Sequence, residues 1–129
     1  MFALDTNTLI YFFKGQGAVA GNLRACTPGE VVIPAVVVYE LERGIEASGS
    51  IKRRRALQQL MKTVSVLPFD GAAARVAASI RVQLDRAGTP IGVLDGMIAG
   101  TVVVSGATLV TNNVREFRRV PGLRVVDWY

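Results

Sequence analysis

The sequence contains no histidine and only one cysteine, Cys26. The absence of histidine excludes Ser-His-Asp and Cys-His triads, HExxH zinc sites and Cys₂His₂ zinc fingers. A lone cysteine cannot form an intramolecular disulfide. We therefore expect a reducing, cytoplasmic environment and a packing role for Cys26.

Long uninterrupted apolar runs are also missing. The most apolar stretch, Val93–Val110, is interrupted by an aspartate, three glycines and a serine, so it is unsuited to span a bilayer. The N-terminal segment MFALDTNTLIYFF has no basic region before it and carries Asp5 early. We therefore expect neither a signal peptide nor contact with a membrane. The chain also lacks a GxGxxG or Walker lysine motif, which argues against a nucleotide-binding protein.

What is present is a short, apolar and basic chain. Its 129 residues are 50% hydrophobic and 19% charged, which predicts one folded domain over residues 1–129. Fifteen basic and ten acidic residues give a net charge of +5, a weak sign of a polyanionic partner. The charge is uneven: −2 over residues 1–49, +6 over 50–90, −1 over 91–113 and +2 over 114–129. An acidic pocket with basic flanks is consistent with this distribution.

Short apolar segments alternate with segments of helical pattern. The expected strands are Phe2–Leu4, Val31–Ile33, Ser65–Leu67, Thr108–Val110 and Leu123–Val126. The expected helices are Thr8–Lys14, Ala18–Cys26, Ala35–Ser48, Lys52–Val64, a long helix capped by Asp70 and ending near Ala87, and Ile91–Val104. Residues 35–39 are rich in β-branched side chains, but the helical spacing of Val37, Leu41 and Ile45 favours a helix. The alternation predicts an α/β fold whose short, mostly parallel sheet is covered by helices.

Three carboxylates lie in mostly apolar surroundings. Asp5 follows the first strand, Glu40 lies within VVVYEL, and Asp95 lies within IGVLDGMIAG. Two unit charges about 4 Å apart interact by roughly 4 kcal/mol at an effective dielectric of 20, so three such groups need compensation to converge. A divalent cation supplies it, and oxygen ligands suit Mg²⁺ or Mn²⁺.

Each residue also has a plain structural interpretation. Asp5 suits a helix cap, Glu40 an ordinary helix position, Asp95 a first helical turn, and Asn112-Asn113 a turn or helix start. The basic run Lys52–Arg55 suits a solvated helix face. The individual patterns do not decide between these interpretations and a functional site.

Four blocks of sequence, in order along nearly the whole chain, resemble the PIN-domain ribonucleases and most closely the VapC toxins of bacterial toxin–antitoxin pairs. The blocks are FALDTNT, YELERG, PIGVLDGMIAG and TNNVREFRRVPGLRVVDW. The resemblance implies a PIN-like three-layer fold. It also implies that Asp5, Glu40 and Asp95 are catalytic acids that bind the metal, with Thr6, Asn7 and Thr111 supporting the site. Asn113 occupies the place of a fourth acid in many PIN domains, and Glu116 lies close to it in sequence.

The same resemblance implies a metal-dependent endoribonuclease and several partners. We expect one Mg²⁺ or Mn²⁺, an RNA substrate such as tRNA, a cognate VapB-like antitoxin and a homodimer. The basic side chains expected to follow the RNA backbone are Lys52, Arg53, Arg54, Arg55, Arg115, Arg118, Arg119 and Arg124. The main alternative is a catalytically degenerate PIN-fold binding module, which the missing acid at position 113 favours. A phosphatase or response-regulator receiver fits less well, because the last lysine is Lys62.

Overall fold

The computed structural model describes all residues 1–129 and is built on a five-stranded parallel sheet of order β3-β2-β1-β4-β5. The strands are β1 (Phe2–Leu4), β2 (Val31–Pro34), β3 (Ser65–Leu67), β4 (Thr108–Val110) and β5 (Arg124–Val126). β1 lies at the centre, where Phe2 is aligned with Val31 of β2 and Leu4 with Val110 of β4. Because all strands are parallel, their carboxyl ends meet along one edge. That edge carries the polar residues that follow β1 and β4.

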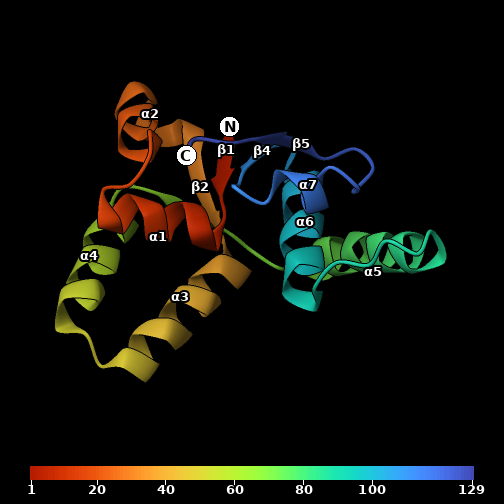
Figure 1. The fold of residues 1–129 in the computed structure, drawn as a ribbon, viewed down its shortest axis with the longest axis horizontal. Helices are drawn as coiled ribbons and strands as arrows, with labels where there is room; N and C mark the ends of the chain where they lie inside the picture. The colour runs from red at the N-terminus through yellow and green to blue at the C-terminus, as the bar shows by residue number, and fades with distance from the viewer.

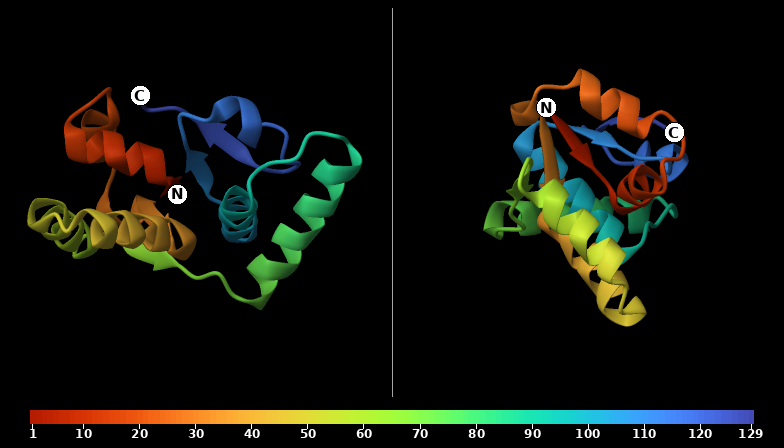
Figure 2. Two further views of the ribbon diagram at one scale, coloured as in Figure 1. Left: turned by 60° about the horizontal axis from the view of Figure 1, so that its bottom comes forward. Right: turned by 90° about the vertical axis from the view of Figure 1, so that its left-hand side faces the viewer.

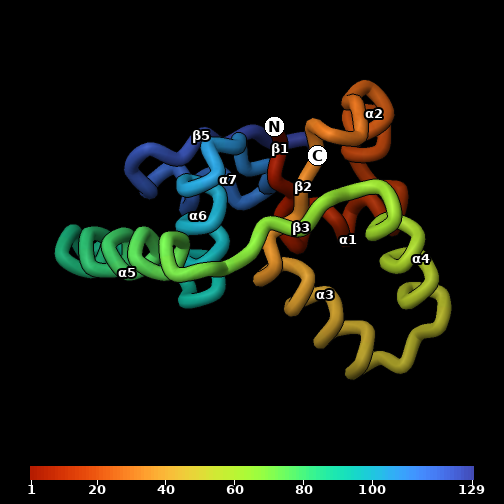
Figure 3. Tube along the Cα trace, turned by 180° about the vertical axis from the view of Figure 1, so that it is seen from behind, coloured from red at the N-terminus to blue at the C-terminus, as the bar shows by residue number.

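Seven helices surround the sheet (Figure 1). They are α1 (Thr6–Lys14), α2 (Val19–Ala25), α3 (Ala35–Ser48), α4 (Ile51–Met61), α5 (Gly71–Arg86), α6 (Val93–Ser105) and α7 (Val114–Phe117), with a 3₁₀ turn η1 (Pro28–Glu30) before β2. Helices α3 and α4 project from one side of the molecule and α5 from the other (Figures 1 and 2). Seen from behind, β3 lies on the path from α4 to α5 (Figure 3).

Side-chain caps and glycines set several helix ends. Asp5, Ser50 and Asp70 each accept a hydrogen bond from a backbone N–H in the first turn of the helix that follows, as favoured N-cap residues do. Helix α3 ends at Gly49, which has a φ of 64°. Glycine adopts this left-handed conformation without the steric cost that a Cβ atom imposes.

The core lies where α3 and α6 pack on the sheet, and α5 extends it by packing on α6. Residues Ala3, Leu4, Ile33, Leu109 and Val110 are fully buried on the strands. Helices α5 and α6 pack so closely that a Cβ atom at Gly100 would lie 2.8 Å from the Cβ of Ala77. Glycine at position 100 permits this approach. None of the helices has the length and hydropathy that a bilayer crossing requires.

The predicted α/β architecture is confirmed, and so is the helical assignment of residues 35–48. Several boundaries differ by one to three residues; for example, α6 spans Val93–Ser105 rather than Ile91–Val104. Helix α1 begins at Thr6 rather than Thr8, α2 spans only Val19–Ala25, and α4 ends at Met61 rather than Val64. Helix α7 follows Asn112-Asn113, for which a turn or helix start was one interpretation, and η1 falls at the Thr27-Pro28-Gly29 turn.

Candidate functional site

Asp5 is the most constrained acid at the carboxyl edge of the sheet. It follows β1 and caps α1, where its Oδ1 accepts a hydrogen bond from the Thr8 backbone N–H at 2.9 Å. Its Oδ2 accepts a second hydrogen bond from the Thr111 hydroxyl at 2.5 Å. Burial raises the pKa of Asp5 above its ordinary value, although these hydrogen bonds lower it, and the charge of Asp127 raises it further. The structural and functional interpretations of Asp5 are therefore compatible: it caps the helix and also lines a pocket.

Thr111 links the polar residues that follow β4 to Asp5. Its side chain is fully buried, and its hydroxyl oxygen accepts the backbone N–H of Asn113 at 3.0 Å while it donates to Asp5. Asn113 in turn donates from Nδ2 to Glu116 Oε2 at 3.0 Å. With its amide nitrogen used in this way, Asn113 has its carbonyl oxygen as the remaining side-chain ligand atom.

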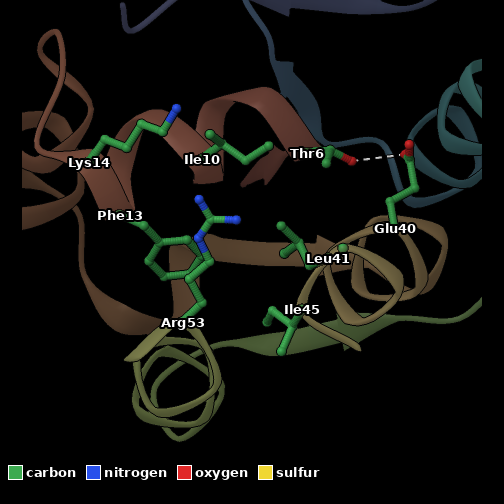
Figure 4. A pocket seen from close by; sticks show the side chains of 9 residues that line it. Thr6, Ile10, Phe13, Lys14, Glu40, Leu41, Ile45 and Arg53 are labelled. Atoms are coloured by element: carbon green, nitrogen blue, oxygen red, sulfur yellow. Dashed lines mark hydrogen bonds between the residues drawn. The ribbon is translucent and has the colours of Figure 1, made fainter. Parts of the chain in front are cut away.

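Glu40 reaches the same region from the second turn of α3. The hydroxyl of Thr6, in the first turn of α1, donates to Glu40 Oε1 at 2.8 Å (Figure 4). This bond joins α1 to α3 through two residues that lie 34 positions apart in sequence. It leaves the second oxygen of the Glu40 carboxylate for another ligand.

Asp95 lies in the first turn of α6 and is half-buried. Burial raises its pKa to about 6, and repulsion from Glu40, Glu116 and Asp5 adds to the rise. Asp5, Glu40 and Asp95 line one pocket, so their negative charges repel one another. A cation in their midst would relieve this repulsion.

These side chains line one pocket. Its walls are Asp5, Thr6, Asn7, Glu40, Asp95 and Asn113, and apolar Ile98 and Phe117 complete it. In their present side-chain positions, no three carboxylates are gathered closely enough to hold one ion among them. The donor set of carboxylate, amide and hydroxyl oxygens nevertheless suits a hard divalent cation, because such ions prefer oxygen ligands.

Comparison with known proteins decides the family. The family model of the PIN domain matches residues 2–123. The chain is 40% identical over 128 residues to the tRNA(fMet)-specific endonuclease VapC of Shigella flexneri. The matched region covers 98% of this chain and 97% of that relative. The chain belongs to the VapC family of PIN-domain ribonucleases. Its predicted family, its endoribonuclease activity and its place as the toxin of a type II toxin–antitoxin pair are thereby confirmed.

Solved VapC structures share this fold. The DNA-bound VapBC of Salmonella typhimurium matches with a TM-score of 0.88 and 36% identity over 99% of this chain and 98% of that chain. VapBC2 of Rickettsia felis, bound to a promoter DNA fragment, matches with a TM-score of 0.89 and 28% identity over 99% and 98%. The similarity therefore extends over the whole PIN fold.

The basic residues of this VapC chain differ in whether their side chains are free or already engaged. Arg54 is paired with Glu42 and Glu46 of α3, so it joins α3 to α4. The other three basic residues of its run, Lys52, Arg53 and Arg55, are exposed. Near the C-terminus, Arg115, Arg118 and Arg124 are exposed. Arg119 donates to the Pro90 carbonyl and Arg124 to the Gly106 carbonyl.

Two acidic residues contribute to the site beyond the three acids singled out from the sequence. Glu116 binds Asn113 and raises the pKa of Asp95, so it supplies a charge near the position where many PIN domains have a fourth acid. Asp127, just after β5, acts on Asp5 by its charge and was not predicted. Its position at the carboxyl end of a predicted strand was the signal that could have identified it.

Proposed function

We propose that this VapC chain cleaves RNA with the help of one divalent cation, Mg²⁺ or Mn²⁺, held by Asp5, Glu40 and Asp95. The observation that supports the proposal most strongly is their convergence, with Asn113, on one pocket from four separate parts of the chain. A cation bound there supplies two effects: it acidifies a water molecule and offsets negative charge on the phosphate.

The chain's own residues prepare this chemistry. Thr111 fixes the orientation of Asp5 from across the sheet, and Thr6 fixes Glu40. The Asn113 carbonyl oxygen offers a neutral ligand, while Glu116 keeps a negative charge beside it. The pKa of Asp95 is raised to about 6, so its carboxyl group is mostly ionised at neutral pH and can act as an anionic ligand. Below about pH 6, where Asp95 is protonated, we expect cation binding to displace its proton.

Purified chain incubated with RNA tests the proposal. Cleavage should require Mg²⁺ or Mn²⁺, stop on addition of EDTA, and be lost in Asp5→Asn. Cleavage that survives chelation or the substitution would contradict the metal mechanism. A degenerate binding module would instead show no cleavage and no stabilisation by Mn²⁺ in a thermal-shift titration.

We also propose a structured RNA, such as tRNA, as the substrate. A tRNA(fMet)-specific relative at 40% identity supports this choice. The exposed Lys52, Arg53 and Arg55 on α4, Arg115 on α7 and Arg118 just after it provide positive charge for the phosphate backbone. Cleavage mapping on total tRNA, with Asp95→Asn as the inactive control, identifies the target. Cleavage of unstructured RNA alone would contradict a tRNA substrate.

A groove beside the active site fits a VapB-like antitoxin. It lies among α1, α3 and α4, with Thr6 and Glu40 at one end and Lys14 and Arg53 at the other (Figure 4). The apolar side chains Ile10, Phe13, Leu41 and Ile45 also line it, with Phe13 beside Arg53. Neither Lys14 nor Arg53 forms a salt bridge. A peptide with a basic residue, apolar residues and an acidic residue would match the groove in charge.

Copurification with the cognate antitoxin tests this groove. Ile10→Asp should weaken the complex, because it puts a charge among apolar side chains, whereas the exposed Val82→Asp on α5 should not. Equal affinity of both variants for the antitoxin would exclude the groove as its binding site. Expression of the wild-type chain alone should arrest a bacterial host, and Asp5→Ala should relieve the arrest. We expect a homodimer, and sedimentation velocity measures it directly.

A further inference from the structure

An exposed aromatic ring lies beyond the catalytic pocket, at the same carboxyl edge of the sheet. Tyr129 follows β5 with 59% of its surface exposed. Its ring packs against that of Tyr11 of α1 in an edge-on arrangement, with centroids 4.6 Å apart and planes at 65°. Figures 1 and 2 place the C-terminus beside α1 and α2.

Tyr129 is held in place from several sides. Its backbone N–H donates to Asp127 Oδ1 at 2.8 Å. The preceding residue, Trp128, is buried and accepts a backbone hydrogen bond from Ala18 at 3.0 Å. A Cβ atom at Gly17 would lie 2.8 Å from the Tyr129 carbonyl carbon, so the backbones are in close contact. An exposed ring fixed in this way loses little conformational freedom when a ligand stacks on it.

A chain of polar contacts connects this ring to the catalytic pocket. The Tyr11 hydroxyl donates to Asn112 Oδ1 at 3.4 Å, and Asn112 Nδ2 donates to Asp127 Oδ2 at 3.5 Å. Asn112 lies between Thr111, which binds Asp5, and Asn113, which lines the pocket. The aromatic pair is therefore positioned by the same loop that shapes the active site.

We propose that Tyr129, braced by Tyr11, is a stacking platform for one unpaired RNA base next to the nucleotide being cut. This inference rests on the proposed function, because it assigns the platform to the substrate of that site. Unpaired bases in RNA are commonly recognised by stacking on tyrosine rings, which requires no base-specific hydrogen bond. The carboxylate of Asp127 disfavours a phosphate at this position, so a base face is the part of RNA that fits.

Binding measured without cleavage tests the platform. A fluorescent single-stranded RNA is titrated with chains that carry Asp5→Asn, and anisotropy gives the affinity. Adding Tyr129→Ala should weaken binding about tenfold, within the range that loss of one stacked base gives. Tyr129→Phe keeps the ring and should bind within twofold of the parent. Tyr39→Ala, which removes an exposed tyrosine on α3, should also bind within twofold.

Two further arms decide the outcome. An abasic ribose-phosphate strand should bind Tyr129→Ala and its parent equally; an equal loss on abasic and normal strands would overturn base stacking. Equal losses in Tyr129→Ala and Tyr39→Ala would also overturn it, and melting temperatures show whether each variant is folded. Cleavage by the unsubstituted chain is scored separately. If the chain does not cleave RNA, the proposed function fails even where binding depends on Tyr129; if it cleaves but binding ignores Tyr129, only the platform fails.

Discussion

The carboxyl group of Asp95 is half-buried, and its pKa is raised to about 6 by burial and by the charges of Glu40, Glu116 and Asp5. The unfolded chain has no such pocket, so Asp95 ionises there near its ordinary value. Ionised Asp95 therefore opposes folding when no cation is bound. Asparagine has nearly the same shape without the charge. We expect Asp95→Asn to stabilise the fold at neutral pH while abolishing cleavage.

The size and direction of this effect follow from the pKa. A rise from 3.8 to about 6 corresponds to about 3 kcal/mol of disfavoured ionisation, and screening of this partly exposed group reduces the expected effect to about 1–2 kcal/mol. The folded chain holds the proton more tightly than the unfolded chain. The penalty is therefore absent below about pH 4, grows towards about pH 6 and is complete above it.

Urea unfolding in EDTA measures the prediction at acid and neutral pH. Asp95→Asn should match the wild type at about pH 4 and exceed it by about 1–2 kcal/mol at neutral pH. Mn²⁺ should then stabilise the wild type more than the variant, because the variant has lost an anionic ligand. The argument would be refuted if Asp95→Asn were less stable than the wild type at neutral pH. It would also be refuted if the variant gained the same stability at both pH values.

Three other substitutions test separate parts of the structure. Thr111→Val removes a hydrogen bond to Asp5 that is worth about 1.5–3 kcal/mol when the carboxylate is ionised. The pKa of Asp5 should therefore rise further, and the acid limb of the kcat/KM profile should shift to higher pH. Asn113→Asp adds a charge to the pocket and should tighten Mn²⁺ binding in a thermal-shift titration; unchanged affinity would place residue 113 outside the coordination shell. Gly100→Ala puts a methyl group 2.8 Å from Ala77 and should lower stability by about 1–3 kcal/mol, seen as a lower Tm.

The sequence predicted the sheet and most helices because their patterns are local. Asp5 follows a short apolar run, and strands that alternate with helices bring such strand ends together at one edge. Glu40 and Asp95 were identified by their apolar neighbours and by the family resemblance. Helix α7 was left open as a helix start at Asn112-Asn113, because four residues are too few to show helical periodicity.

Long-range pairs were beyond sequence reasoning. Thr111 binds Asp5 across 106 residues, and no local pattern specifies that partner. Arg54 was grouped with its basic neighbours as an RNA-binding candidate. In the structure it pairs with two acids of α3, because the turn at Gly49-Ser50 brings α4 beside α3. Charge counted along the chain therefore overstates the positive charge available to RNA.

An asparagine at position 113, with the acidic Glu116 nearby, limits charge repulsion in the folded pocket. Asp5 and Asp95 already have raised pKa values, so another carboxylate at position 113 would add repulsion at the most crowded point. Glu116 lies one helical turn further on, where its carboxylate accepts the Asn113 amide instead of facing Asp95 unpartnered. Its charge still reaches the pocket, as its effect on Asp95 shows. The chain thus keeps negative potential for a cation while it limits the repulsion that the folded state must bear.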